Sequence, residues 1–387
     1  MEWQGLLDNI LDTYGLYAQA EVPGETPPLV HDRDDDGHAV SESIVRATTL
    51  GLSTTSDDKG QSVAGGASSR GSSYYAAIAT CPKMWNLRYR RGLITRWDPP
   101  YRMGGTLIHR ALAHYWAARM NPQPAWHQSS PAYLHQELAT LGRGYPSLVE
   151  KALQCYDAYE AHYSQGPQRP DLEWIPISAE SVFSATIDEI DPPGDRRMSD
   201  DERAVGSELV TCRPDLLYII ANGQDGRTVD GLPRIRLCDH KTEGNDWSGG
   251  FKRTSLKVWD GDGQYTISWQ QMLYLHILRV RFGADRVAGA TIQRVRRESP
   301  YLVERHPLEI QTRPYTEVPR TLRHVAAMAR RIGMEAAEGI APVSYLWSCE
   351  TRWGPCDYRA LCATHSVDDA LVALRGLYVE LPKRENT

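Results

Sequence analysis

The chain has 387 residues, a net charge of −6 and a hydrophobic fraction of 41%, which is typical of a soluble protein with two domains or one large core with attachments. The negative balance argues against coating of nucleic acid over the whole surface, but it leaves room for a local basic groove. No apolar run approaches the roughly 20 residues that cross a bilayer, and no secretory signal opens the chain, so we expect a cytoplasmic protein without membrane contacts.

The N-terminal region divides into a helix and a polar segment. Residues 1–20 place apolar side chains at helical spacing and predict an amphipathic helix: Trp3, Leu6, Leu7, Ile10, Leu11 and Tyr14. This helix either packs on its own protein, which is the favoured interpretation, or binds a protein partner. Residues 21–72 are rich in Gly, Ser, Thr, Asp and Pro, a composition that predicts a flexible linker or extension.

The next region, residues 73–367, is predicted to form the main domain, and residues 368–387 a C-terminal tail. Its patterns run in chain order as helices over 73–163, strand-like segments at 173–187, 208–221 and 234–240, a helix at 266–282, a strand at 287–297 and a helix at 318–338. This order predicts an α/β fold with a small mixed sheet flanked by helices.

Acidic residues lie at the ends of two of these predicted strands. Asp215 stands within "CRPDLLYII", and Asp239 and Lys241 end the strand in "RIRLCDHKTEG". Alternate strand residues share a face, so Asp239 and Lys241 project together while His240 points away. If the two strands are neighbours, Asp215 and Asp239 meet at one end of the sheet, and two carboxylates with waters suit Mg²⁺.

The Asp-x-Lys spacing alone carries little weight, because the chain contains a second copy. Asp57 and Lys59 have the same spacing in the polar segment, but no strand precedes them. The acid on a preceding strand and the apolar run before Asp239 distinguish the two copies. Without that context, Asp239 and Lys241 would be a surface ion pair worth at most about 1 kcal/mol.

The ordered set of motifs resembles the PD-(D/E)XK nuclease superfamily in its RecB-type branch, which includes CRISPR-associated iron-sulfur exonucleases. "GTLIHRAL" matches the Gly-x-x-x-His helix with Gly105 and His109, and "SWQQMLYLHIL" matches the Gln-x-x-x-Tyr helix with Gln270 and Tyr274. Glu180 is the candidate for the acid on the first strand. Arg213 and Pro214 depart from the pattern, because a glycine and a small apolar residue are common there.

The resemblance implies a restriction-endonuclease-like mixed sheet and a metal-dependent phosphodiesterase. Asp215, Asp239 and the backbone carbonyl of His240 would hold Mg²⁺, with His109 as a further ligand, and an imidazole in the set makes Mn²⁺ an alternative. Lys241 would position the attacking water and stabilise negative charge on the phosphate. Gln270 and Tyr274 share a helix face and would contact the substrate or orient the site, with Gln271 as a competing choice for the amide.

Four of the seven cysteines form a second implied cofactor site. Cys81 lies near the start of the helical region, and "SCETRWGPCDYRALC" contains Cys349, Cys356 and Cys362. Four thiolates suit a [4Fe–4S] cluster or Zn²⁺, and one distant cysteine joined to a C-terminal trio resembles the iron-sulfur nucleases. The six-residue gap between Cys349 and Cys356 is wider than usual for them. Cys155, Cys212 and Cys238 are interpreted as small buried residues.

The substrate implied by this reading is DNA, either single-stranded or at duplex ends. Arg88, Arg90 and Arg91 lie beside tyrosines in "NLRYRRG", a mixture that binds a strand by charge and stacking. We therefore expect a deoxyribonuclease, more specifically an exonuclease, that serves recombination, repair or phage DNA processing in a bacterial or phage-infected cell. The alternatives are a non-catalytic DNA-binding protein on the same fold and a zinc-stapled enzyme of unrelated fold.

Overall fold

The computed structural model describes residues 70–95, 100–120, 123–124, 126–165, 174–220, 228, 231–243, 268–296, 303–308, 312–337, 350–351, 354–362 and 378–380. The predicted N-terminal helix, nearly all of the predicted linker and Cys349 lie outside the described residues, as does most of the predicted tail. None of the helices in the described ranges combines the length and the apolar run that crossing a membrane requires.

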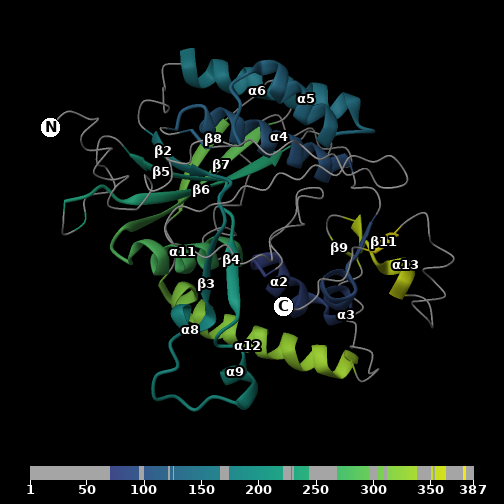
Figure 1. The fold of residues 1–387 in the computed structure, drawn as a ribbon, viewed down its shortest axis with the longest axis vertical. Helices are drawn as coiled ribbons and strands as arrows, with labels where there is room; N and C mark the ends of the chain where they lie inside the picture. The colour runs from purple at the N-terminus through teal and green to yellow at the C-terminus, as the bar shows by residue number, and fades with distance from the viewer. Residues whose placement is uncertain are drawn as a thin grey trace, which may run out of the picture.

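A five-stranded mixed sheet forms the centre of the molecule (Figure 1). Its strands, in spatial order, are β2 (Trp174–Ala179), β5 (Leu216–Ile220), β6 (Ile235–Glu243), β7 (Val287–Arg296) and β8 (Val303–Leu308). Neighbours are antiparallel except β6 and β7, which are parallel. A parallel pair needs a crossover, and helix α11 (Trp269–Phe282) supplies it. The expected mixed sheet is confirmed.

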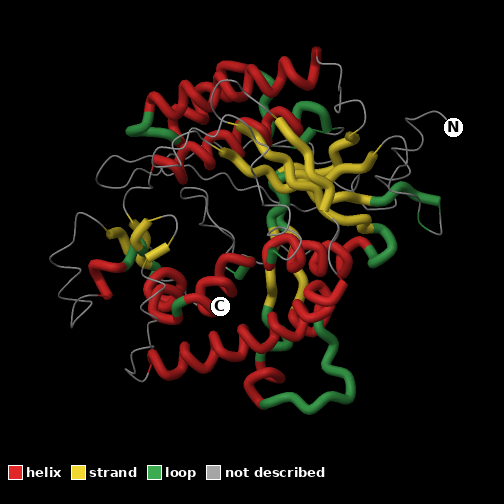
Figure 2. Tube along the Cα trace, turned by 180° about the vertical axis from the view of Figure 1, so that it is seen from behind, coloured by secondary structure: helices red, strands yellow, loops and turns green. Residues whose placement is uncertain are grey.

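Helices cover both faces of this sheet (Figures 1 and 2). One face carries α4 (Pro100–Ala117), α5 (Pro131–Leu141) and α6 (Pro146–Gln165), whose apolar residues form a core with that side of the strands. The other face carries α11, and the long helix α12 (Thr312–Ala337) packs against α11 farther from the sheet; both helices contribute to a second core. The sheet is therefore buried on both sides, and polar residues within its strands, such as Thr291 and Gln293 of β7, are buried as well.

A two-stranded ribbon continues from the sheet toward α12 (Figure 1). β3 (Phe183–Thr186) pairs with β4 (Leu209–Cys212), while β2 pairs with β5 from Trp174 to Ala179. The ribbon and the sheet meet at a bend made by residues 180–182 on one chain segment and 213–215 on the other. Each of the first two segments that the sequence predicts as one strand is therefore two strands in the structure: β2 and β3 in the first, and β4 and β5 in the second. The prediction missed this break because a bend leaves the alternating apolar pattern almost unchanged.

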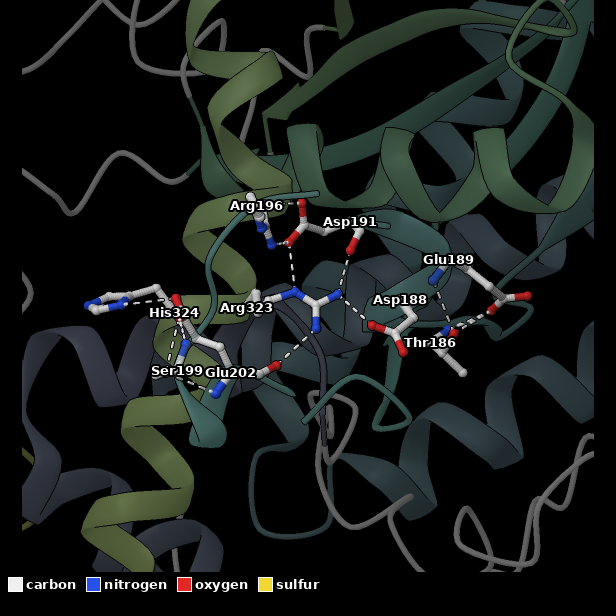
Figure 3. A network of polar contacts seen from close by, with 9 residues as sticks. All are labelled: Thr186, Asp188, Glu189, Asp191, Arg196, Ser199, Glu202, Arg323 and His324. Carbon is white, nitrogen blue, oxygen red and sulfur yellow. Dashed lines mark hydrogen bonds and ion pairs between the residues drawn. The ribbon is translucent and has the colours of Figure 1, made fainter. Parts of the chain in front are cut away.

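A buried ionic network ties the far end of the ribbon to α12 (Figure 3). Arg323 of α12 is fully buried; its guanidinium donates to the carboxylates of Asp188 and Asp191 at 2.6 and 2.7 Å and to the carbonyl of Glu202 at 2.9 Å. Asp188 lies within the short helix α8 (Ile187–Ile190), Asp191 follows its last residue, and Glu202 lies in α9 (Asp200–Ala204). Arg196 donates to Asp191 as well, so every buried charge in the network is paired.

The two ends of the described core meet beside α2 (Ser72–Thr80). After α3 (Pro82–Trp85) and a π-helical turn η2 (Asn86–Arg90), strand β1 (Leu93–Thr95) pairs antiparallel with β11 (Tyr378–Glu380). The hydroxyl of Tyr358, just before α13 (Arg359–Cys362), donates to the carbonyl of Leu93 at 2.7 Å. We call this contact of residues 87–95 with residues 356–362 and 378–380 the clasp; the small hairpin of β9 (Glu350–Thr351) and β10 (Gly354–Pro355) precedes its second segment.

Candidate active site

The strand pairing brings the two predicted aspartates to one place. Leu216 of β5 pairs with Cys238 of β6, so the next positions along the two antiparallel strands are Asp215 and Asp239. β5 begins at Leu216, whereas β6 continues to Glu243 alongside β7. Asp239 therefore lies inside its strand rather than at its end, which corrects the sequence-based boundary. β6 is longer than the sequence predicts because it pairs with the parallel strand β7 as far as Glu243. Pairing between distant segments leaves no local signal in the sequence.

Asp215 is held by a backbone amide and a histidine. Its Oδ2 accepts from the backbone N–H of His240 at 2.5 Å, and its Oδ1 lies 3.3 Å from Nδ1 of His109 on α4. Burial alone would raise the pKa of Asp215, but the neighbouring His109 outweighs it and holds the pKa well below its usual range. The same carboxylate raises the pKa of His109, although burial opposes this. Each of the two groups thus favours the charged form of the other.

Glu180 joins this pair at the bend of the ribbon. Its φ of 56° is the only left-handed value among the described non-glycine residues, and its backbone N–H donates to the carbonyl of Asp215 at 3.3 Å. Ligand atoms of His109, Glu180 and Asp215 all lie within 4.8 Å of one another. Burial and the charge of Asp215 raise the pKa of Glu180 to about 7 against the opposing charge of Arg213. Strain and a shifted pKa coincide here, as is common at functional sites.

Asp239 and Lys241 form the opposite side of the site, on one face of β6. Lys241 Nζ lies 2.7 Å from Asp239 Oδ2, and the lysine side chain keeps 27% of its surface exposed. Burial and the charge of Asp215 raise the pKa of Asp239, although Lys241 opposes the shift. His240 points to the other face, as its alternation predicts, and its ring centroid lies 6.2 Å from that of His109. The metal-binding role of its carbonyl stays a prediction.

The amide that contacts Asp239 most closely is Gln271. Its Nε2 donates to Asp239 Oδ2 at 2.8 Å, whereas the Nε2 of Gln270 lies 3.4 Å from Oδ1. Gln271 is fully buried. Gln270 instead faces Tyr274, one turn along α11, whose pKa burial raises. Gln271, the alternative to Gln270 for this role, is therefore the closer contact of Asp239. The spacing of the motif does not distinguish the two adjacent glutamines.

A glycine sets how close α4 approaches the sheet. A Cβ at Gly105 would lie 3.3 Å from Oγ1 of Thr242, the residue after Lys241. This contact is tighter than ordinary van der Waals packing, so glycine at 105 permits the observed approach. His109 lies one turn later on the same helix and consequently reaches Asp215. The Gly-x-x-x-His spacing thus has a packing reason as well as a chemical one.

Two of the four candidate cluster cysteines, Cys81 and Cys356, have described side chains; Cys356 belongs to the clasp, and Cys81 lies six residues before its first segment. Cys81 is buried, and its Sγ accepts from the backbone N–H of Met84 at 3.4 Å. Cys356 and Met84 both pack against the small apolar cluster of the clasp, made by Leu87, Leu93, Tyr358, Leu361 and Tyr378. Cys362 ends α13, but its side chain lies outside the described set. The three cysteines expected to be inert, Cys155, Cys212 and Cys238, are buried and unbridged.

The three predicted DNA-binding arginines stand on or beside the π-helical turn. Arg88 lies over the ring of Tyr89, with 5.4 Å between Cζ and the centroid. Arg90 donates to the backbone carbonyl of Gly333 in α12, so one of its nitrogens holds two helices together. Arg91 ends the turn and is partly exposed. The role of these three arginines in substrate binding stays a prediction.

Comparison with known proteins identifies the family. A profile of the PD-(D/E)XK nuclease superfamily matches residues 72–363, most of the chain. The protein therefore belongs to the PD-(D/E)XK nuclease superfamily, and the expectation of a nuclease on a mixed α/β fold is confirmed. Among solved structures, a "putative exonuclease" of Eubacterium rectale is similar at 13% identity and a TM-score of 0.37, over 77% of this chain and 88% of that one. The search of curated proteins found no match.

Proposed function

We propose that this nuclease is a metal-dependent DNA exonuclease of the RecB-type branch, with a [4Fe–4S] cluster at its clasp. The observation that carries the catalytic part is the meeting of His109, Glu180 and Asp215 with the Asp239–Lys241 pair at one end of the sheet. Motifs spread over more than a hundred residues converge there, which is not expected of unrelated surface charges. Recombination, repair and phage DNA processing are the settings in which we expect it to work.

The acids of the site fit a divalent cation. Glu180, Asp215 and Asp239 are three carboxylates in a partly buried space, and Arg213, Lys241 and His109 are the basic side chains in contact with them. Burial is the largest cause of the raised pKa values of Glu180 and Asp239, so a bound cation would stabilise their charged forms. We assign His109, Asp215 and Asp239 as ligands, with the His240 carbonyl, and add Glu180 as a fourth side chain. Oxygen ligands with one imidazole suit Mg²⁺ or Mn²⁺.

Bound metal would polarise the phosphate and lower the pKa of a coordinated water. The chain's own part in cleavage falls to Lys241 and the groups that orient Asp239. Lys241, half turned to solvent and anchored on Asp239, would hydrogen-bond the attacking water and balance charge that develops on the phosphate. Gln271 fixes the Asp239 carboxylate from the buried side, so one of its oxygens keeps a constant direction. Gln270 and Tyr274 would line the substrate side.

The described part of the clasp supports the assignment of an iron-sulfur cluster. Cys81 accepts the backbone N–H of Met84, and Met84 and Cys356 pack on the same apolar cluster. We assign Cys81, Cys349, Cys356 and Cys362 as its ligands, on the resemblance to the iron-sulfur nucleases. Because the clasp joins segments more than 250 residues apart, such a cluster would act as a structural staple.

Two alternatives remain distinct from this proposal. A non-catalytic DNA-binding protein on the same fold would keep the basic surface near Arg88 and Arg91 without cleaving. A zinc-stapled protein would keep the four thiolates with a different metal. The first concerns the catalytic site and the second concerns the clasp, so the two are tested separately.

The catalytic proposal is tested with end-labelled linear DNA, single-stranded and duplex, beside covalently closed circular DNA. Each substrate is incubated with Mg²⁺, Mn²⁺ or EDTA. We expect linear DNA to be degraded with either metal, circular DNA to survive, and EDTA to stop the reaction. Degradation of the circle as well would make the protein an endonuclease. Binding of DNA without cleavage in either metal would favour the non-catalytic alternative.

The cluster proposal is tested by analysis of anaerobically purified protein. We expect a brown protein with about four irons per chain. Cys81→Ser and Cys356→Ser should remove the iron, whereas Cys155→Ser, a matched change of a buried free cysteine, should keep it. About one zinc and no iron would establish the zinc alternative. Iron that survives Cys81→Ser would exclude a cluster that joins the two ends of the chain.

A further inference from the structure

The bend of the ribbon contains a cation that the catalytic assignment does not use. Arg213 lies between β4 and β5, two residues before Asp215 and across the bend from Glu180. Its Nε lies 3.1 Å from Oε2 of Glu180. The arginine side chain keeps 38% of its surface exposed, and that of Glu180 keeps 17%. Arg213 is therefore more exposed to solvent than the candidate metal ligands next to it.

The geometry of the pair leaves part of the guanidinium for another group. The closest contact to Glu180 uses Nε, the nitrogen nearest the backbone, so the opposite edge of the planar fork faces away from that carboxylate. Arg323 provides a comparison within the same protein. That arginine is fully buried, and Nε, Nη1 and Nη2 all donate to protein oxygens (Figure 3). For Arg213, the closest contact within the described part of the chain is that of Nε with Glu180, and the side chain is 38% exposed rather than buried.

The charge of the site favours an anion at that edge. A DNA phosphate that approaches Glu180, Asp215 and Asp239 meets three carboxylates, and Lys241 is already paired with one of them. A half-exposed arginine at the entrance offsets this repulsion and can bind phosphate oxygens through two parallel N–H donors. Stability gives little reason for the pair, since ion pairs this exposed contribute about 1 kcal/mol or less.

We propose that Arg213 binds a backbone phosphate of the DNA at or next to the bond that is cleaved, while Glu180 holds its other edge. This inference rests on the proposed nuclease function and names a substrate-binding residue within it. Glu180 then has two neighbours, the metal-binding cluster and Arg213, so the bend would couple the position of the substrate phosphate to the position of a ligand. The competing role for Arg213 is to orient Glu180 alone.

The test compares Arg213→Gln and Arg213→Lys with the wild type. Binding of a fluorescent oligonucleotide is measured by anisotropy in EDTA over a range of salt, and KM and kcat are measured with Mg²⁺ or Mn²⁺. We expect Arg213→Gln to weaken binding and raise KM by roughly tenfold or more, the loss of a charge-assisted contact. The slope of log K against log salt should be smaller in magnitude by about one unit for Arg213→Gln than for the wild type. Arg213→Lys, which keeps the charge without the fork, should recover part of the affinity.

A second substrate identifies the phosphate. In a series of oligonucleotides, one linkage at a time is replaced by an uncharged methylphosphonate. At the contacted linkage, wild type and Arg213→Gln should bind equally, whereas at other linkages the roughly tenfold difference should persist. The control is Arg203→Gln, which removes an exposed arginine paired with Asp200 in α9. This change should alter neither the DNA affinity nor the effect of the methylphosphonate.

The outcomes separate this inference from the function on which it rests. If the wild type cleaves DNA and Arg213→Gln keeps its KM, affinity and salt dependence, the inference is overturned and the function stands. A lower kcat or melting temperature with unchanged affinity would likewise show that Arg213 only orients Glu180. If the wild type cleaves no DNA with either metal, the function is overturned, and the anisotropy and methylphosphonate arms still decide whether Arg213 contacts phosphate.

Discussion

The protein contains two clusters of acidic and basic side chains, and they are built in opposite ways. Around Arg323, two carboxylates and a carbonyl are matched by two arginines, and each buried charge has a close partner (Figure 3). At the end of the sheet, three carboxylates lie beside Arg213, Lys241 and His109, whose side chains are 27–38% exposed. The first cluster is complete around a fully buried arginine, whereas the basic side chains of the second reach solvent.

The pKa shifts express the same difference. In the Arg323 cluster, burial alone would raise the pKa of Asp191, but hydrogen bonds from Arg196 and Arg323 outweigh it and lower the pKa. In the catalytic cluster, burial raises the pKa values of Glu180 and Asp239 despite nearby cations. A complete cluster stabilises the fold, and an incomplete one stores binding capacity for a cation or a substrate at some cost to stability. Charge balance therefore helps to distinguish a structural ionic network from a catalytic one.

The largest expected effect is on catalysis at the incomplete cluster. Asp239→Asn and Lys241→Ala should each lower the cleavage rate by on the order of a thousandfold, because a metal ligand or the group acting on water and phosphate is lost. The melting temperature should change little, since Asp239→Asn also removes an unfavourable buried charge. Single-turnover cleavage and thermal unfolding are the measurements.

The control for that pair is Asp57→Ala, which alters the second Asp-x-Lys copy and should cleave like the wild type. Near-normal cleavage by Asp239→Asn would mean that the metal is held elsewhere.

The opposite result is expected at the complete cluster. Arg323→Ala removes the arginine from Asp188 and leaves Asp191 with Arg196 alone, and it should lower the free energy of unfolding by about 3–5 kcal/mol. Cleavage per folded molecule should stay within about twofold, because Arg323 lies on α12 rather than in the site. Urea unfolding followed by tryptophan fluorescence measures the first quantity.

A matched change for Arg323→Ala is Arg330→Ala on the same helix, where little loss of stability is expected. A strong loss of specific activity in Arg323→Ala would show that the two clusters are coupled.

The third prediction concerns acid stability. Because the folded-state pKa of Asp191 is lowered relative to its ordinary value of 3.8, its contribution to stability is present above pH 3.8 and is lost as the pH falls through the lower folded value. Asp191→Asn should therefore lower stability at neutral pH and flatten the acid limb of a plot of unfolding free energy against pH. An acid limb as steep as that of the wild type would assign the transition to other carboxylates.

The smallest effect is expected from the packing that places His109. Gly105→Ala adds a Cβ against Thr242 and should lower kcat by roughly threefold to tenfold through a small shift of α4. Stability should hold, since alanine favours a helix. The double variant Gly105→Ala with Thr242→Ala removes the Oγ1 that the new Cβ meets and should restore most of the rate. A single variant as active as the wild type would show that the Thr242 side chain moves aside freely.

The sequence predicted the chemistry of the site better than its geometry. The order of His109, Asp215, Asp239 and Lys241 identified the family, and alternation along β6 correctly separated His240 from its neighbours. The sheet and its helical cover were also predictable, because they follow from hydrophobic periodicity. The roles of the individual site residues stay predictions.

What the sequence concealed depends on contacts between distant segments. Strand β8 was not predicted, and the bend at Glu180 interrupts a segment that is apolar and alternating on both sides. The Arg323 network joins residues more than a hundred positions apart, so no local window contains it. Gln271 shares its chemistry with Gln270, and the fold of α11 against β6 decides between them. Arg213 could be noticed in the sequence, because it is a charged residue where the resembled branch commonly has glycine. Nothing in the sequence indicated that Glu180 is its partner.

The clasp has a consequence for the order in which this chain can fold during synthesis. Leu93 and Tyr358, which it joins, are 265 residues apart. At a synthesis rate of about 5–20 residues per second, the segment with β1 waits roughly ten seconds to a minute before its partner exists. During that time the apolar side chains of Leu87 and Leu93, buried in the finished protein, have no cover from β11 or Tyr358. A ligand held by thiolates from both ends can be acquired only when the chain is nearly complete, so its insertion would be a late step of maturation.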